Sequence, residues 1–412
     1  LILGAMFQLL LGSMRGDSPT FDETAHIAAG FGYIKEFDYR LNPEHPPLIK
    51  VLAALSGELF THPRFPTDTP SWQEYNQNRW WLQFDQGRAF LYESGNNPDR
   101  VIFWSRLPIL LLSILLGWLL FWWTSRQYGQ KTALVTLLLY AFSPTVLAHS
   151  RYVTTDIAAT FGFFTGLTIF LKFLEKPTAK NMLLTGIVFG IAQLLKFSLI
   201  MLIPIYGILL VCWAWAYPAE TAREKLLIFG KLALKTTAIG FVGILAIWIV
   251  YIPFIWNYPQ DRQLSDAASQ LSTNSARALV IFDLALIQNK FTRPLGEYVL
   301  GVLMANQRAA GGNTSYFLGE VSSKGSRAYF PLLYLLKESL ALHVLTLFAA
   351  AGGLFRAAHA LQQRSAYKER VRSWIHSNFS LCGMAVVIAV YGTISIISPL
   401  NIGIRHVLPT LP

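Results

Sequence analysis

Two adjacent carboxylates, Asp22 and Glu23, stand near a histidine in "FDETAHIAAGFGYI" at residues 21–34. If this segment is helical, Asp22 and His26 share one face, because side chains four residues apart line up. A carboxylate there could act as a general base that removes a proton from a hydroxyl. Acids also stabilise a helix N-terminus, so Thr20 or Asp22 could serve only as a cap. A zinc-protease helix would need a second histidine four residues away, which this segment lacks.

A third carboxylate, Asp156, begins an apolar run in "AHSRYVTTDIAATFGFF" at residues 148–164. A structural cap at a helix start is one interpretation of this position. A carboxylate at a membrane boundary is costly unless it is paired, and such residues are often functional. His149 and Arg151 are the candidate partners within the segment.

Lys196 interrupts an otherwise apolar run in "AQLLKFSLIML" at residues 192–202. A lysine at a helix end can extend its ammonium group to the membrane surface while its stem stays in apolar surroundings. The functional alternative is a cation that faces the anionic head group of a lipid.

The stretch "LNPEHPPLIKVLAAL" at residues 41–55 reads as an extended entry followed by an amphipathic helix. Pro46 and Pro47 fit the entry and first turn of that helix, which is a purely structural account. Glu44 and His45 beside the prolines are candidate polar contacts to a substrate.

The composition indicates a membrane protein. Of the 412 residues, 53% are hydrophobic and only 14% are charged, with a mean hydropathy of +0.40. Soluble domains carry about 25% charged residues. The run "LPILLLSILLGWLLFWW" at residues 107–123 is long enough to cross a hydrocarbon core of about 30 Å as a helix.

The apolar runs predict nine membrane spans, near residues 1–14, 102–123, 132–148, 157–174, 182–195, 199–216, 236–256, 329–353 and 378–398. The loops around 124–131, 172–181, 217–235 and 354–377 hold fourteen Lys and Arg against four Asp and Glu. Basic loops stay in the cytoplasm, so these four are predicted to be cytoplasmic. The segments 15–101 and 257–328 then lie outside.

This orientation brings the unusual polar residues to one side of the membrane. The predicted outer set is Asp22, Glu23, His26, Arg106, His149, Arg151, Asp156, Lys196, Lys324, Arg327, Arg405 and His406. Basic residues are less expected outside. Better candidates for binding a ligand than any lysine of the inner loops are therefore Lys324, Arg327, Arg405 and His406.

The net charge of +11 does not indicate nucleic acid, because the basic residues gather in short loops between apolar runs. Cys212 and Cys382 fall inside predicted spans without disulfide or metal-site spacing, which fits packing. We expect one transmembrane domain over residues 1–412, with outer loops at 15–101 and 257–328. The sequence starts and ends within apolar runs, so we expect further spans beyond its C-terminal end.

The chain resembles the protein O-mannosyltransferases and their bacterial relatives, which are lipid-carrier-dependent glycosyltransferases of the GT-C fold. The resemblance rests on the acid pair at 22–23 and on five motifs in family order: "HPPL" (45–48), "SRLP" (105–108), "HSRYVTTD" (149–156), "YFPLLYLLKESL" (329–340) and "NIGIRHVLP" (401–409). The 257–328 segment shows no β-rich insertion of the kind that eukaryotic members carry. This favours a bacterial relative and leaves a protein acceptor in doubt.

The resemblance implies an all-α polytopic membrane protein, a GT-C type helical bundle whose large first extracytoplasmic loop carries amphipathic helices. It also implies an enzyme of the inner membrane, with its active site on the periplasmic or exterior side. Such enzymes move a sugar, mannose or another hexose or pentose, from a polyprenyl-phosphate carrier to a hydroxyl on a protein, lipid or glycan. By motif, Asp22 is the principal catalytic acid with Glu23 beside it, Asp156 is the second outer acid, and Arg106 is the arginine of the second span.

The residue types fit this chemistry on their own. A carboxylate base can activate the acceptor hydroxyl, and cations stabilise the departing lipid phosphate. Single displacement inverts the anomeric carbon and needs one base, unlike the paired carboxyls of retaining glycosidases. The candidate donor-binding residues are Arg106, Lys196, Arg405, His406 and His45.

Two other classes of protein stay open. A lipid or sugar-lipid transporter would place polar residues in the middle of its spans, often at broken helices. A structural or sensory membrane protein would not need several helix ends to bring acids and cations together. The sequence leaves open whether His26 and the acids hold a divalent metal.

Overall fold

The computed structural model describes residues 1–74, 80–219, 221–362 and 367–411, and within them it is almost entirely helical. The first loop and the spans up to the middle of the chain contain α1 (Ile2–Met14), α2 (Phe21–Lys35), α3 (Pro47–Thr61), α4 (Pro70–Gln73), α5 (Leu82–Arg88), a π-helical turn (Ala89–Glu93), α6 (Pro98–Tyr128), α7 (Gln130–Ala141), α8 (Pro144–His149), α9 (Asp156–Glu175) and α10 (Ala179–Gln193). The rest contains the 3₁₀ helix η3 (Phe197–Met201), α11 (Leu202–Ala216), α12 (Ala222–Phe254), α13 (Gln260–Gln270), α14 (Arg277–Gln288), α15 (Arg293–Gly311), β1 (Ser315–Phe317), β2 (Glu320–Ser322), α16 (Tyr329–Lys337), α17 (Leu340–Gln362), α18 (Tyr367–Ser377), α19 (Phe379–Ile397) and the 3₁₀ helix η4 (Ile404–Thr410). The prediction of an all-α polytopic protein is confirmed; β1 and β2 form one small antiparallel hairpin.

Five helices of the described chain are long and apolar enough to cross a membrane: α6, α9, the η3–α11 helix, α12 and α19. The pair α16–α17 passes the same test as one span but is bent by 115°. The other predicted spans correspond to shorter helices, such as α7 with 12 residues, which is about 18 Å long. Multiple spanning helices are therefore present, although fewer than the nine predicted reach full length.

Two predicted spans are interrupted, and both predictions of one continuous helix are wrong. The 132–148 run divides into α7 and α8, because Ser143 and Pro144 start a new helix whose first turn is capped by the Ser143 hydroxyl. The 329–353 run breaks at Glu338, whose extended backbone ends α16 before α17 begins. Hydropathy detects an apolar run but not a bend within it.

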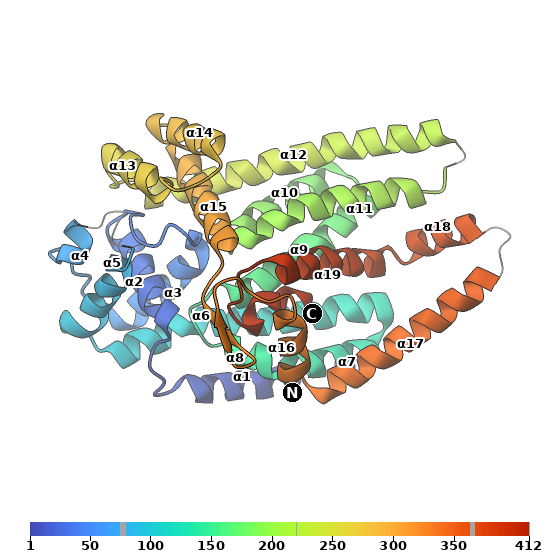
Figure 1. Ribbon diagram of the computed structural model, residues 1–412, viewed down its shortest axis with the longest axis horizontal. Coiled ribbons are helices and arrows are strands. Elements are labelled where there is room, and N and C mark those ends of the chain that lie inside the picture. The colour runs from blue at the N-terminus through green and yellow to red at the C-terminus, as the bar shows by residue number, and fades with distance from the viewer. Residues whose placement is uncertain (75–79, 220, 363–366, 412) are drawn as a thin grey trace.

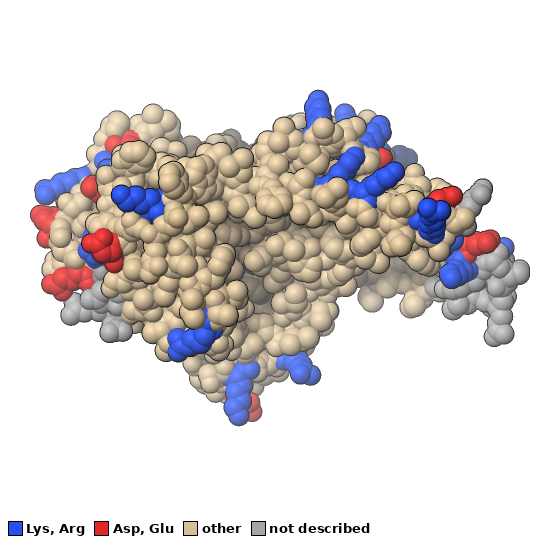
Figure 2. Space-filling model, turned by 90° about the horizontal axis from the view of Figure 1, so that it is seen from above, with Lys and Arg blue, Asp and Glu red and all other residues tan. Residues whose placement is uncertain are grey.

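The long helices run side by side, and helices of the segments predicted to lie outside gather at one end of the molecule (Figure 1). Helices α2, α4, α5, α13 and α14 lie at that end. The adjoining ends of α11 and α12, and of α17 and α18, lie at the other. Figure 2 shows a broad uncharged middle, with charged side chains mainly toward the two ends and one edge. This distribution fits an apolar belt across the spans.

Glycines allow α10 and α12 to approach closely. A Cβ on Gly186 would lie 2.5 Å from the Val242 Cβ, and one on Gly190 would lie 2.8 Å from the Gly243 carbonyl oxygen. Small residues four apart let membrane helices pack backbone to backbone. This contact fixes the C-terminal end of α10, from which the chain continues to Lys196.

The contact between α2 and α3 also depends on one glycine. A Cβ on Gly30 would lie 2.2 Å from the Lys50 carbonyl oxygen and 2.7 Å from its carbonyl carbon. Both atoms belong to backbone, so no side-chain rotation relieves the overlap.

We therefore expect Gly30→Ala to separate α2 from α3 and to destabilise the protein by about 1–3 kcal/mol. The matched control is Gly207→Ala in α11, where a Cβ would meet nothing within 4 Å. That change should leave stability equal or improve it by up to about 1 kcal/mol through helix propensity. Thermal unfolding in detergent measures both, and equal midpoints for the two variants would contradict this account.

Candidate functional site

The N-terminus of α2 is organised by the side chain of Glu23. Thr20 is the N-cap residue, and both its backbone N–H (2.8 Å) and its hydroxyl (3.1 Å) donate to Glu23 Oε2. An acid at the third helical position that reaches back to the N-cap fixes where the helix begins. The cap of α2 therefore does not need the Asp22 side chain.

Glu23 also forms a fully buried ion pair with Arg106 of α6. Arg106 Nε and Nη2 donate to the two carboxylate oxygens, each at 2.8 Å, and both side chains have 0% exposure. The backbone N–H of Val153 adds a bond of 2.9 Å, and the remaining guanidinium contacts go to the carbonyl oxygens of Asp17 and Ser18. The pair thus joins three segments that are far apart in the sequence.

Asp22 points to the opposite, more open side of the helix start. Its Oδ2 accepts from Arg405 Nη1 at 2.6 Å, and the two side chains are 33% and 30% exposed. Burial alone would raise the pKa of the Asp22 carboxyl, but His26 and the Arg405 guanidinium outweigh it and hold the pKa below its ordinary value. Asp22 is therefore an accessible, ionised carboxylate.

Asp156 forms the second carboxylate–cation pair. It is the first residue of α9, and its Oδ1 accepts from Lys196 Nζ at 2.7 Å. Lys196 lies at the break between α10 and η3, with 15% of its side chain exposed. The ammonium group therefore ends on a partner within the protein and does not simply extend to the membrane surface.

The two pairs act on each other. Burial lowers the pKa of Arg405, but the charges of Asp156 and Asp22 together raise it above its ordinary value. The Asp156 charge likewise acts on Asp22. Asp22, Asp156, Lys196 and Arg405, from four separate elements, thus form one charge cluster, called the acid–cation cluster below.

Two histidines line the cluster on the α3 side. His26 Nδ1 lies 2.8 Å from the Val153 carbonyl oxygen, and its ring meets His45 edge to face at 4.8 Å. Burial lowers the pKa of His26, and burial with the neighbouring His26 lowers that of His45 well below the ordinary value. Burial thus favours the neutral form of both rings.

His406 adjoins the cluster, but its ring faces apolar surroundings. It stacks on Phe330 at 5.6 Å and lies 6.1 Å from the Tyr391 ring, whose hydroxyl donates to the His406 carbonyl oxygen. Burial and the nearby Lys196 lower its pKa to about 4. His406 is thus neutral and helps to seat η4, which carries Arg405.

Lys50 is a structural residue that sequence reasoning missed. Its ammonium group is fully buried and donates to the Tyr33 hydroxyl, the Asn42 carbonyl and side-chain oxygens and the His45 carbonyl, at 2.7–3.1 Å. These bonds hold the 42–45 turn, and with it Glu44 and His45, against α3. The available signal was a lone lysine within the apolar "LIKVLAAL" helix.

The other predicted outer residues lie outside the acid–cation cluster. Arg151 pairs with Asp17 and also donates to the Ser13 carbonyl at 2.6 Å. His149 is half-buried, and burial lowers its pKa. Lys324 and Arg327 are exposed between β2 and α16, and neither forms an ion pair within the described ranges.

No group of three or more His, Cys, Asp or Glu side chains within the described part of the chain is arranged to hold a metal ion. The two carboxylates of the cluster, Asp22 and Asp156, each pair with a cationic side chain. The carboxylates that could bind a metal ion are thus already neutralised by Lys196 and Arg405.

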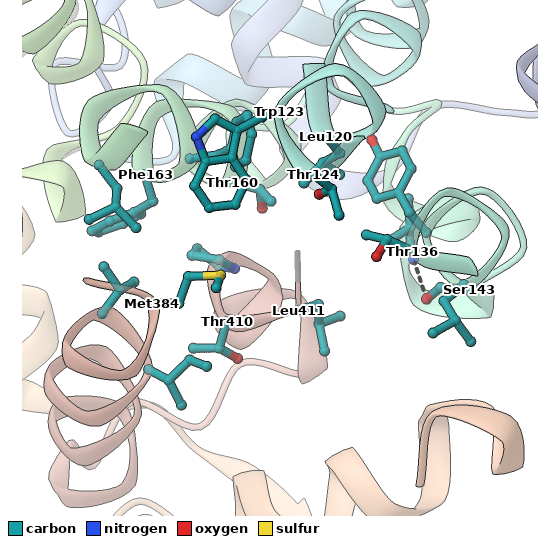
Figure 3. Close-up of a pocket in the computed structure, with 18 of the residues that line it drawn as sticks. Leu120, Trp123, Thr124, Thr136, Ser143, Thr160, Phe163, Met384, Thr410 and Leu411 are labelled. Atoms are coloured by element: carbon teal, nitrogen blue, oxygen red, sulfur yellow. Dashed lines mark hydrogen bonds between the residues drawn. The ribbon is translucent and has the colours of Figure 1, made fainter. Parts of the chain in front are cut away.

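A cavity of about 640 Å³ lies between α6, α7, α9, α17 and α19 and reaches η4. Figure 3 shows apolar and threonine side chains around it, among them Trp123, Phe163, Met384 and Thr410. It shares α9 with the cluster, because Thr160 in its wall lies one turn after Asp156. An apolar chain could lie here with its polar end at the cluster.

Comparison with known proteins gives a family match. Residues 99–256 match the family model described as dolichyl-phosphate-mannose-protein mannosyltransferase. No protein of curated function matches the chain. Among solved structures, the Archaeoglobus fulgidus oligosaccharyltransferase, in complex with zinc and sulfate, aligns with 100% of this chain at 14% identity and a TM-score of 0.44. The alignment covers 48% of that protein, so this chain spans about half its length.

The family match confirms the resemblance inferred from the motifs over residues 99–256, which are less than half of the chain. Over that segment the chain is similar to the dolichyl-phosphate-mannose-protein mannosyltransferases. The matched residues include Arg106, Asp156 and Lys196. Asp22 and Arg405 lie outside the match and are brought to these residues by the fold.

Proposed function

We propose that the protein transfers a sugar from a polyprenyl-phosphate carrier to an acceptor hydroxyl on the extracytoplasmic side of the membrane. The observation that carries this proposal is the acid–cation cluster, in which the Asp22–Arg405 and Asp156–Lys196 pairs meet at the ends of separate helices. The family match supports the class of donor, since that family is described by its use of dolichyl-phosphate mannose, a lipid-phosphate sugar. The basic loops predicted to be cytoplasmic support the side.

The proposed reaction is a single displacement. The acceptor oxygen attacks the anomeric carbon while the bond from that carbon to the phosphate oxygen breaks. The electron pair of that bond leaves with the lipid phosphate, and Asp22 accepts the proton of the acceptor hydroxyl. One displacement inverts the anomeric configuration. Asp156 positions the substrate from the α9 side.

Arg405 and Lys196 stabilise the phosphate that departs. Fixed cations aimed at developing negative charge are among the strongest contributions to catalysis. In the absence of donor these groups neutralise Asp22 and Asp156. The apolar cavity, whose wall includes Thr160 one turn after Asp156, offers the carrier chain a place near the cluster.

The site residues divide into two groups. Asp22, Asp156, Lys196 and Arg405 carry the reaction in this proposal. Glu23 and Arg106 were candidates for catalysis and for donor binding. Since both are fully buried against each other, we propose that they act as positioning residues that hold α2 against α6. His45 and His406 support the 42–45 turn and η4.

The test is release of polyprenyl phosphate from radiolabelled polyprenyl-phosphate sugars by the full chain in nanodiscs. Arg405→Ala and Lys196→Ala should each lower kcat/KM for the donor by roughly 10- to 100-fold, the value of a charge-assisted hydrogen bond. Lys324→Ala, which removes an exposed basic residue without an ion pair, should leave it unchanged. Equal losses in all three variants would show that only general positive charge matters.

A transporter is the second candidate, because one structural feature favours it. Helices α16 and α17 meet at a break where Glu338 is 7% exposed and accepts from the Ser143 hydroxyl at 3.1 Å. Broken helices with buried acids are typical of transporters. If folded wild-type protein binds the lipid but cleaves it with no sugar or acceptor extract, this function replaces the transferase.

A further inference from the structure

A group of aromatic side chains lies directly beside Asp22. Phe21, the first residue of α2, stacks on Phe84 of α5 at 4.2 Å, with 25° between the ring planes. Trp81 meets Phe21 at 6.0 Å and Phe84 at 5.6 Å, and Trp80 meets Trp81 at 5.1 Å. These four residues are called the aromatic shelf.

The shelf is exposed although it is made of large apolar rings. Phe21 is 57% and Trp81 is 61% exposed, whereas other rings of the first loop, such as Phe31 and Phe90, are completely buried. Exposed clusters of aromatic residues next to polar groups mark binding surfaces. The described contacts of Phe21 and Trp81 therefore leave much of each ring free for a ligand.

Polar groups border the shelf on the α3 side. Trp80 Nε1 donates to Glu44 Oε1 at 3.0 Å, and Arg308 of α15 approaches Glu44 Oε2 at 3.5 Å. The Arg308 guanidinium also lies 6.0 Å from the centre of the Trp80 ring. A carboxylate and a guanidinium at the edge of an aromatic surface can bond the hydroxyls of a ligand that lies on the rings.

The shelf and the cations flank Asp22 on different sides. Asp22 meets Arg405 of η4, whereas the preceding residue, Phe21, meets Phe84 of α5. Successive helical side chains diverge by about 100°. A group that lies on the shelf therefore reaches Asp22 from a direction other than that of the phosphate-binding cations.

We propose that the aromatic shelf binds a saccharide and that the acceptor hydroxyl belongs to that saccharide. This inference rests on the proposed function and names its acceptor class. A sugar ring has apolar C–H faces and a rim of hydroxyls. The electron-rich faces of Phe and Trp match the C–H faces, and Glu44 and Arg308 match the rim.

The surroundings favour a saccharide over a peptide. One common mode of binding an extended peptide adds a strand to an exposed sheet edge. Within the described ranges, the strands are Ser315–Phe317 and Glu320–Ser322, which belong to a segment outside the first loop. The shelf offers rings and hydroxyl-bonding side chains in place of a strand edge.

The test uses saturation-transfer NMR on the full chain in nanodiscs, with a soluble hexose disaccharide and a Ser/Thr-rich peptide as probes. We expect the disaccharide signal to fall by about five- to tenfold in Trp81→Ala and in Phe21→Ala. Trp256→Ala, which removes a ring that is 74% exposed at the end of α12, should leave it unchanged. Because Trp81 is 61% exposed, its removal should leave the fold intact, and the unfolding midpoint of the variant checks this.

Three outcomes would overturn the proposal. A signal from the peptide that depends on Trp81, without one from the disaccharide, would make the shelf a peptide site. Quenching of Trp81 fluorescence by brominated acyl chains, lost in Trp81→Phe, would place the shelf in the bilayer. A disaccharide signal that is equal in wild type and both shelf variants would place the saccharide elsewhere.

Donor cleavage separates this inference from the proposed function. If wild type releases polyprenyl phosphate but shows no Trp81-dependent saccharide contact, only the saccharide assignment fails. If the saccharide contact is present and no donor is cleaved, the transferase function fails and the shelf stands as a binding site. Measuring both quantities on the same preparations decides between these cases.

Discussion

Asp22→Asn is expected to lower turnover by about 10²- to 10⁴-fold, the usual contribution of a general base. The amide keeps the size of the carboxylate and can still accept from Arg405, but it cannot take the acceptor proton. The measurement is the rate of polyprenyl-phosphate release at saturating donor. Since the pKa of Asp22 lies below its ordinary 3.8, the wild-type carboxylate is ionised at neutral pH, and activity there should not depend on its protonation.

The control for this substitution is Asp85→Asn. Asp85 lies on α5 in the same loop and is 51% exposed, and its contact with Arg88 is 4.0 Å long. We expect its loss to leave turnover within about twofold of wild type, since exposed pairs contribute little. Full turnover by Asp22→Asn would exclude Asp22 as the base, and the reaction would then need another proton acceptor.

The largest effect on stability is expected for the Glu23–Arg106 pair. Removing one partner leaves an uncompensated charge in a site with 0% exposure, which costs about 3–5 kcal/mol. Glu23→Gln should therefore lower the unfolding midpoint strongly and reduce the yield of monodisperse protein. Glu23 also loses part of its bonding to Thr20 and Val153, which adds to the effect.

The matched control is Arg64→Ala. Arg64 and Asp68 form an exposed pair at 3.8 Å, with side chains 71% and 76% exposed. Exposed pairs contribute about 0–1 kcal/mol, so the midpoint should hardly change. If Glu23→Gln proves as stable as Arg64→Ala but inactive, the buried pair takes part in the reaction, and its assignment as a positioning pair is wrong.

Residue type and predicted membrane side were enough to select most of the acid–cation cluster from the sequence. Asp22, Asp156, Lys196 and Arg405 are each unusual where they stand, and the orientation rule put them on one side. Their pairing could not be predicted, because Asp22 and Arg405 are separated by 383 residues. That separation is bridged only by the packing of the bundle.

Residue types alone could not show which of Asp22 and Glu23 is buried, and only the resemblance singled out Asp22. Adjacent helical residues face different directions, and only the position of α6 decides which of the two is buried. The break at Glu338 was hidden for a similar reason, since the apolar run continues through it. Lys50 was overlooked because a single lysine on an apolar helix carries no signal about the oxygens that surround it.

The buried pair of Glu23 and Arg106 has a consequence for biogenesis. Arg106 lies within a 31-residue apolar helix, where an unpaired guanidinium opposes insertion into lipid. Its partner is synthesised 83 residues earlier, so α2 is already available when α6 enters the membrane. A first loop that has folded incorrectly would leave the arginine unpaired and the helix poorly retained. The pair thereby links insertion of the second apolar helix to correct folding of the loop that carries Asp22.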